Sequence, residues 1–310
     1  MTMTQTMADA TSPVRTTAQA LHKRDLADLE ETACRLSRDI IEMTTKAGSG
    51  HPSSSLSAID ILTGLYFGGI LRYAPERPTW ADRDRFILSK GHGAPALYAV
   101  LAEAGYFDKT LLSTLRQIGS PVEGHPNMRA LPGVEASTGS LGQGLSIGLG
   151  HALAARVDER DYRVYVMIGD GESDEGQIWE AAMCAAKYNV GNLTAILDYN
   201  KFQQTAAVNK VMPSLAPVID KWEAFGWYTR EIDGHDMSQV MAALHAVSTV
   251  SQQPQLIVAH TRKGRGLAPF EENETNRKHG EALDEDEMAT ALAELQCGGV
   301  ETGESSSIHR

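Results

Sequence analysis

The stretch from residue 163 to residue 203 constrains the fold most, because two apolar runs flank a helical segment there. The runs 164–168 and 193–197 carry β-branched residues and are typical of buried strands. Between them, residues 175–188 place apolar side chains at helical spacing, and glycine at position 191 ends that segment. A strand, a helix and a second strand in this order make the two strands parallel, so their carboxyl ends share one edge of a sheet.

Polar residues follow both of these strands. Asp170 stands between Gly169 and Gly171 after the first strand, and Asn200 follows the second. Neighbouring strands lie about 4.8 Å apart, so a carboxylate and an amide oxygen could hold one hard cation such as Mg²⁺ or Ca²⁺. The glycines let a phosphate approach the backbone, and the helix start favours an anion. Gly-Asp-Gly alone favours an ordinary turn, but Asn200 at the matching strand end reverses this preference and favours a metal and phosphate site.

Composition limits the class of protein. The 310 residues are 42% hydrophobic and 22% charged, which is typical of a globular chain that buries one large α/β domain or two smaller ones. The net charge of −12 argues against nucleic acid and anionic membrane as partners. No membrane-length apolar run and no secretory signal occur. Three cysteines without C-x-x-C spacing suit a reducing compartment, which predicts a cytoplasmic location.

Strands and helices alternate along the rest of the chain. This alternation predicts an α/β fold with a doubly wound, mostly parallel sheet and helices on both faces. We expect one domain over residues 21–296, flexible tails at 1–20 and 297–310, and a polar flap at 269–280. Further strands are expected at 85–88, 228–232 and 255–260, and further helices at 25–46, 54–67, 96–104, 145–155, 221–227, 237–250 and 284–295.

Four of the histidines that stand next to glycines form a candidate set. They are His51, His92, His125 and His279. A single histidine of this kind equally suits an ordinary loop, but the recurrence favours a functional set, since histidine titrates near neutral pH. The glycine-rich loop 138–144 lacks the G-x-G-x-x-G spacing and no clear strand precedes it, so we reject a nicotinamide site.

A basic, glycine-rich segment at 261–266 follows the apolar run 255–260. Three cations within four residues at a strand end favour an anion site in an acidic protein, although a solvated basic loop is the alternative.

Gly169-Asp170-Gly171 followed by Asn200 resembles the signature of thiamine diphosphate enzymes. The surrounding sequence, GESDEGQIWEAAMCAAKYNVGNLTAILDYN, resembles transketolase specifically, and the similarity covers most of residues 25–295. The resemblance implies the diphosphate-binding domain of the thiamine diphosphate-binding fold. Mg²⁺, or Ca²⁺ or Mn²⁺ in its place, would be held by Asp170, Asn200 and the backbone oxygen of Phe202.

The resemblance also implies roles for other residues. The cofactor-binding set is Ser54, His92, Gly139, Ser140, Leu141, Gly171, Glu172, Asn200, Lys263 and His279. The catalytic set, which would line the substrate channel, is His51, His92, His125 and His279. Glu175 matches a buried carboxylate that the family uses at a contact between chains, and Trp179 either joins that contact or packs within the chain.

The implied function is that of the N-terminal subunit of a two-subunit transketolase. It would transfer a two-carbon ketol unit from a phosphorylated ketose to an aldose phosphate, as in pentose phosphate metabolism. A C-terminal subunit with the pyrimidine-binding domain would supply the glutamate that activates the cofactor. We therefore expect a dimer of heterodimers that is active only when both subunits are present.

Two alternatives stay open. One is another thiamine diphosphate-dependent carboligation on a sugar phosphate, by a branched-sugar-phosphate transketolase or a deoxyxylulose-phosphate-type synthase. The other is a cofactor-binding regulatory subunit without turnover. The chain departs from the family at Lys278, where a tryptophan normally precedes His-Gly, so Arg277 and Lys278 could serve a different phosphate or acceptor.

Overall fold

A five-stranded sheet forms the centre of the molecule. The computed structural model describes residues 23–267, 279–295 and 297. The strands are arranged in the order β1-β2-β3-β5-β4, and every neighbouring pair is parallel. Their bounds are β1 Arg85–Leu88, β2 Val164–Gly169, β3 Leu193–Tyr199, β4 Tyr228–Asp233 and β5 Gln255–His260. The predicted parallel α/β sheet is confirmed.

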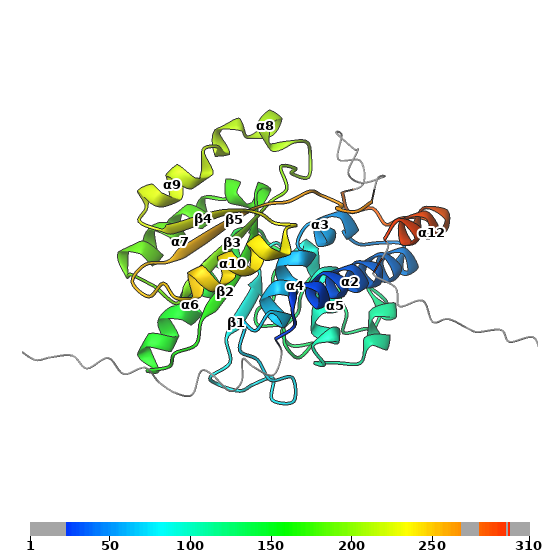
Figure 1. Cartoon of the computed structure of the whole chain (residues 1–310), viewed down its shortest axis with the longest axis horizontal. Coiled ribbons are helices and arrows are strands. Elements are labelled where there is room, and N and C mark those ends of the chain that lie inside the picture. Colours follow the sequence, from blue (N-terminus) through cyan, green and yellow to red (C-terminus); the bar gives the residue numbers. More distant parts are fainter. Residues whose placement is uncertain (1–22, 268–278, 296, 298–310) are drawn as a thin grey trace, which may run out of the picture.

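Helices cover both faces of this sheet (Figure 1). One buried core joins the sheet to α2, α4, α5 and α10, and a second core joins it to α6, α7 and α9. Alternate residues of β2 enter different cores: Tyr165 and Met167 face the first, whereas Val164 and Val166 face the second. Burial on both faces explains why the strands are continuous apolar runs. The helices are α2 Leu26–Ala47, α3 Pro52–Leu56, α4 Ile59–Phe67, α5 Ala94–Glu103, α6 Gln143–Val157, α7 Gly176–Lys187, α8 Val208–Val211, α9 Val218–Ala224, α10 Met237–Ser248 and α12 Glu285–Glu294.

The helix predicted at 54–67 is divided in the structure into α3 and α4. Helix α3 begins two residues earlier than expected because Pro52 occupies its first turn, where proline needs no amide hydrogen. The interruption places the Ser57 hydroxyl against Asp198 of β3, to which it donates a hydrogen bond of 2.6 Å. The helix predicted at 221–227 is α9, which lies three residues earlier and is followed by Gly226 at φ +92°.

The sequence analysis expected three cysteines suited to a reducing compartment, and this is wrong for two of them. Helix α12 packs beside α2 (Figure 1), and Arg38 of α2 donates to the carbonyl of Leu292 at 2.8 Å. This packing brings Cys34 and Cys297 together in a disulfide with a Cα–Cα distance of 5.4 Å. The pairing is invisible in the sequence because 263 positions separate the partners. Cys184 is a free cysteine.

Some expectations concern residues outside the described ranges. These are the N-terminal tail, positions 269–278 of the flap with Arg277 and Lys278, and positions 298–310 of the C-terminal tail. The predicted domain boundaries therefore stay predictions. Among the helices that the structure describes, none combines the length and the apolar character needed to cross a bilayer.

Candidate active site

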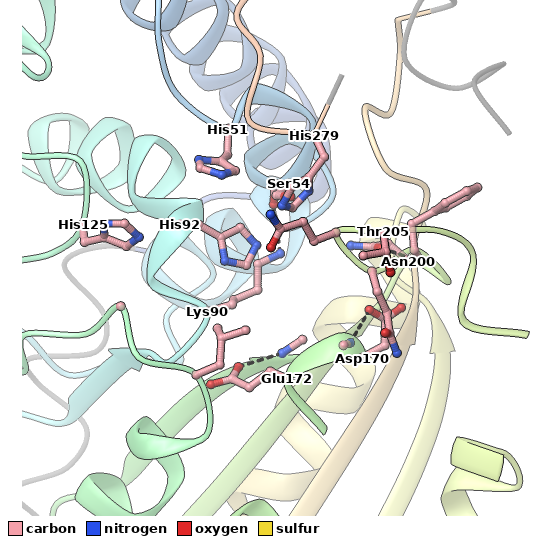
Figure 2. A pocket seen from close by; sticks show the side chains of 17 residues that line it. His51, Ser54, Lys90, His92, His125, Asp170, Glu172, Asn200, Thr205 and His279 are labelled. Atoms are coloured by element: carbon pink, nitrogen blue, oxygen red, sulfur yellow. Dashed lines mark hydrogen bonds between the residues drawn. The ribbon is translucent and has the colours of Figure 1, made fainter. Parts of the chain in front are cut away.

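A cavity of about 450 Å³ opens at the carboxyl edge of the sheet (Figure 2). Segments that follow β1, β2 and β3 supply much of its lining, which is where open α/β sheets bind ligands. All four predicted histidines line it, together with Ser54, Gly139 and Leu141. The structure thus brings residues from distant parts of the chain to one edge of the sheet. The sequence predicted this, because several of these residues directly follow predicted strands.

One corner of the cavity contains the predicted metal ligands. Residue Gly169 of β2 pairs with Asp198 of β3, so the two strand ends lie side by side. The two carboxylate oxygens of Asp170 accept backbone N–H bonds from Gly171 at 2.7 Å and Lys201 at 2.6 Å. Burial, followed by the neighbouring charge of Asp198, raises the pKa of Asp170 to about 7. The folded chain therefore keeps a carboxyl group in a place that disfavours an uncompensated negative charge.

The donor set at this corner fits a hard divalent cation. Asp170, Asn200 and Phe202 all line the cavity, and they offer a carboxylate, an amide oxygen and a backbone carbonyl. A cation beside Asp170 would compensate the charge that burial disfavours. Among the described residues, no group of three or more His, Cys, Asp or Glu side chains is placed to hold a metal. A metal at this corner would thus require the amide and carbonyl oxygens as well.

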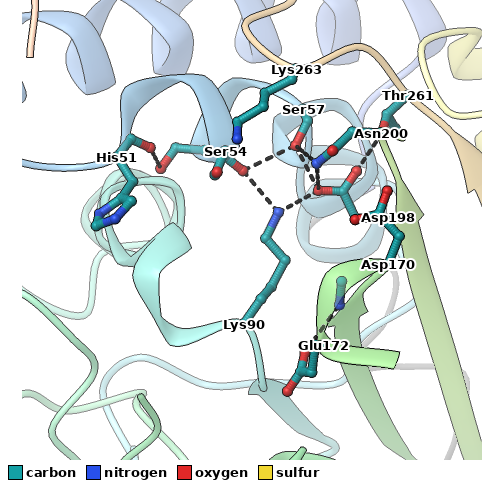
Figure 3. A network of polar contacts seen from close by, with 12 residues as sticks. His51, Ser54, Ser57, Lys90, Asp170, Glu172, Asp198, Asn200, Thr261 and Lys263 are labelled. Carbon is teal, nitrogen blue, oxygen red and sulfur yellow. Dashed lines mark hydrogen bonds and ion pairs between the residues drawn. The ribbon is translucent and has the colours of Figure 1, made fainter. Parts of the chain in front are cut away.

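Lys90 and Asp198 form a buried ion pair beside this corner, which local sequence patterns did not indicate (Figure 3). Lys90 is 1% exposed and also donates to the Ser54 carbonyl at 2.9 Å. Asp198 accepts further hydrogen bonds from Ser57 and Thr261. Burial alone would raise the pKa of Asp198, but the ammonium of Lys90 holds it below its ordinary value. The lysine directly before Gly-His at a strand end is the one sequence feature that could have indicated this cation.

The histidines form a compact group on the opposite side of the cavity. The ring centroids of His51, His92 and His279 lie 5.1–5.6 Å from one another. Gly280, at φ +78°, approaches so closely that an added Cβ would lie 3.1 Å from Nε2 of His51. His125 lies beside Gly139, where an added Cβ would lie 3.3 Å from its ring.

All four imidazoles favour the neutral form. Burial lowers the pKa of His51 to about 4 and that of His279 to about 3. The pKa of His92 also lies well below its ordinary value, and that of His125 is lowered, in both cases mainly because of burial. A neutral imidazole can donate through one ring nitrogen and accept through the other. Nδ1 of His51 is buried without a hydrogen-bond partner in the described structure.

Lys263 contacts this group through His279. Its Nζ lies 2.6 Å from Nδ1 of His279, and the lysine is 7% exposed. Burial and the nearby charge of Lys90 lower the pKa of Lys263 to about 7. A phosphate would restore the positive charge of such a lysine, because an anion favours the protonated amine.

Glu172 organises the glycine loop. Its carboxylate accepts N–H bonds from Gly142 at 2.9 Å and Gly169 at 3.0 Å, and a third bond from the Ser89 hydroxyl. Both oxygens are therefore occupied by protein donors, although Glu172 lines the cavity as predicted. These bonds hold the loop that presents Gly139 and Leu141 to the cavity.

Several predicted residues lie differently from the expectation. Ser140 is exposed and is not among the cavity residues. Glu175, expected to match a buried carboxylate, is exposed in the single chain. Trp179 packs against Trp222 and Phe225 with ring centroids 5.7 and 5.9 Å away, which favours the alternative of a tryptophan packed within the chain.

Besides Lys90, three cavity residues were missed, and these three lie shortly after Asn200. They are Gln203, Gln204 and Thr205. The polar character of this short segment after a predicted metal ligand is the pattern that could have indicated them.

Residues 28–302 match the family described as "Transketolase, thiamine diphosphate binding domain". The chain belongs to the transketolase family. Among solved structures, transketolase from Campylobacter jejuni superposes with a TM-score of 0.80 at 32% identity, covering 86% of this chain and 42% of that one. The transketolase fold therefore accounts for the sheet and for the position of the cavity.

Curated transketolase relatives fall into two kinds by length. The 6-deoxy-6-sulfo-D-fructose transketolase subunit SqwG of Clostridium sp. strain MSTE9 is 43% identical, with 88% of this chain and 98% of that protein covered. The apulose-4-phosphate transketolase subunit of Phocaeicola vulgatus is 41% identical, with 75% and 82% covered. Human transketolase is 40% identical, but the match covers 89% of this chain and only 44% of the human protein.

Proposed function

We propose that the chain is the N-terminal subunit of a split transketolase that moves a two-carbon ketol unit between sugars carrying a terminal anionic group. One observation carries the proposal: neutral histidines, a buried carboxylate with an amide oxygen, and buried Lys90 surround one cavity at the carboxyl edge of the sheet, and Lys263 contacts the cavity residue His279. This combination can accommodate a metal-bound diphosphate beside a polyhydroxylated substrate.

The cofactor side of the cavity is assigned to residues from three strand ends. Asp170, Asn200 and the backbone oxygen of Phe202 would hold Mg²⁺, and Lys263 with His279 would bind the diphosphate. The glycine loop with Gly139 and Leu141 would lie against the rings of thiamine diphosphate. When bound, the cofactor supplies the centre that stabilises a carbanion during ketol transfer.

The histidines are assigned to the substrate. Being neutral, His51, His92, His125 and His279 can each donate a proton to one sugar oxygen and accept one from another. Burial of the group also limits access of water to the reacting atoms.

The names of two relatives support a chemical class for the sugar that serves as donor or acceptor. The names of the two short relatives refer to a sulfonated ketose and to a branched sugar phosphate. We infer that the substrate is a short sugar with a terminal phosphate or sulfonate, and that the second subunit carries the pyrimidine-binding domain. The assembly would be a dimer of heterodimers.

A donor and acceptor screen with the reconstituted complex tests this function. The panel contains 6-deoxy-6-sulfo-D-fructose, fructose 6-phosphate and apulose 4-phosphate as donors with glyceraldehyde 3-phosphate as acceptor. Xylulose 5-phosphate is tested as donor with ribose 5-phosphate as acceptor, because with glyceraldehyde 3-phosphate it would only regenerate itself. Ketol transfer that requires both thiamine diphosphate and Mg²⁺ is expected with at least one donor. Condensation with pyruvate instead of ketose cleavage would support the synthase alternative, and cofactor binding without any turnover would support the regulatory one.

A further inference from the structure

The segment that carries Lys263 follows β5 and is held in place by several polar contacts. We call residues 261–266 the Lys263 loop. The Thr261 hydroxyl donates to Asp198, and the Gly264 N–H donates to the Ser53 carbonyl at 2.9 Å. Two further contacts come from a pair of side chains outside the cavity, Asp60 of α4 and His235 of the turn between β4 and α10.

His235 links Asp60 to the backbone of the loop. Its Nε2 accepts the N–H of Arg262 at 2.8 Å, and its Nδ1 lies 2.7 Å from Oδ2 of Asp60. A ring nitrogen that accepts an N–H bond carries no proton, so the proton of the neutral ring lies on Nδ1 and is donated to Asp60. Both side chains are about 95% buried, which removes competition from water.

Asp60 also contacts the far end of the loop. Its Oδ2 lies 3.3 Å from Nε of Arg265. The turn that carries His235 is itself packed against the start of the loop, because a Cβ added to Gly234 would lie 2.5 Å from Cγ2 of Thr261. The pair therefore fixes the loop on both sides of Lys263, while neither Asp60 nor His235 lines the cavity.

We propose that Asp60 and His235 are positioning residues, which hold the Lys263 loop so that Lys263 lies at the diphosphate end of the cavity. The inference rests on the proposed role of Lys263 in binding the diphosphate. The ammonium contacts His279 at 2.6 Å, so a shift of the loop would displace a lysine and a histidine together. Outer partners of this kind typically change ligand affinity 10- to 100-fold when they are removed.

Two substitutions of His235 distinguish the hydrogen bond to the loop from the effect of simply having a polar side chain at this position. In His235→Gln the amide oxygen reaches the position of Nε2, so the Arg262 N–H keeps an acceptor. In His235→Asn the shorter side chain leaves that N–H without one. The chain also offers a matched control, since His260 pairs with Glu231 at 2.6 Å on the same sheet, but the two side chains are 36% and 57% exposed.

The first measurement is amide hydrogen exchange of the full chain at residues 262–266. His235→Asn should exchange faster there than wild type, whereas His235→Gln and His260→Asn should retain wild-type protection. The second is calorimetric binding of thiamine diphosphate with Mg²⁺ to the complex with the C-terminal subunit. We expect about tenfold weaker binding for His235→Asn, near wild-type binding for the other two variants, and little change in kcat at saturating cofactor.

The outcomes distinguish the inference from the proposed function. Faster exchange without weaker binding, or weaker binding without faster exchange, would overturn the positioning role. Equal behaviour of His235→Gln and His235→Asn would overturn the assignment of the Nε2 contact. If the wild-type complex binds no thiamine diphosphate, the proposed function fails, and the exchange measurement still decides whether His235 holds the loop.

Discussion

Replacing Asp170 by asparagine should stabilise the cofactor-free chain at alkaline pH and abolish cofactor binding. The two effects have one cause. The carboxylate is 2% exposed, and among the described residues its charge is compensated by two backbone N–H bonds and by the more distant Lys90 and Lys263. Asparagine has nearly the same shape but cannot ionise.

The size of the effect follows from the pKa. Burial raises the pKa of Asp170 from 3.8 to about 7. A pKa difference of one between the folded and unfolded chain corresponds to about 1.4 kcal/mol of stability. The folded chain binds the proton more tightly than the unfolded chain, so this stabilisation is present below pH 3.8 and is lost as the pH rises to about 7. Above that pH, the ionised carboxylate lowers the free energy of unfolding by roughly 4 kcal/mol.

Asparagine cannot ionise, so it avoids this decrease in the free energy of unfolding. Its side chain, however, offers one oxygen instead of two. The N–H of either Gly171 or Lys201 then loses its acceptor, which costs about 1–3 kcal/mol. Asp170→Asn should therefore be more stable than wild type by about 1–3 kcal/mol at pH 8 and less stable near pH 4.

Urea unfolding of the full chain at both pH values, with a chelator present, measures this difference. Glu180→Gln, which changes an exposed carboxylate on α7, is the control and should stay within about 0.5 kcal/mol. A destabilised Asp170→Asn at pH 8 would refute the argument from the buried charge. Unchanged calorimetric affinity for thiamine diphosphate with Mg²⁺ would refute the metal assignment.

Three other substitutions test neighbouring parts of the site. Asn200→Ala should weaken cofactor binding in the same calorimetric experiment, but less than Asp170→Ala, because an amide carries no charge. His125→Ala should lower kcat more than it weakens cofactor binding, and wild-type kcat and KM for every donor would show that its role is wrong. Lys90→Ala leaves Asp198 as an unpaired buried charge, so the free energy of unfolding should fall by about 3–5 kcal/mol; a change below about 1 kcal/mol would contradict this ion pair.

The sheet and the neighbouring positions of Asp170 and Asn200 could be predicted because both depend on local patterns. Apolar runs indicate the strands, and the rule for crossover connections makes them parallel. That both strand ends lie at the same edge of the sheet then follows without knowledge of any side-chain contact.

Contacts between distant segments could not be predicted in this way. Lys90 and Asp198 are 108 positions apart, and Cys34 and Cys297 are 263 apart, so no local spacing indicates either pair. The division between α3 and α4 is of the same kind, because Ser57 is placed by its bond to Asp198 across the sheet. In each case the packing of helices on the sheet determines the partner.

Ketol transfer by the separated and recombined subunits tests the central claim most directly. The C-terminal subunit, the chain itself and their mixture are assayed with thiamine diphosphate, Mg²⁺ and the donor panel, and sedimentation gives the mass of each species. We expect no turnover from either component on its own, and turnover in the mixture at the mass of a dimer of heterodimers. Full ketol transfer by the chain alone would contradict the split-transketolase account, as would a mixture that forms the complex but transfers no ketol unit from any donor.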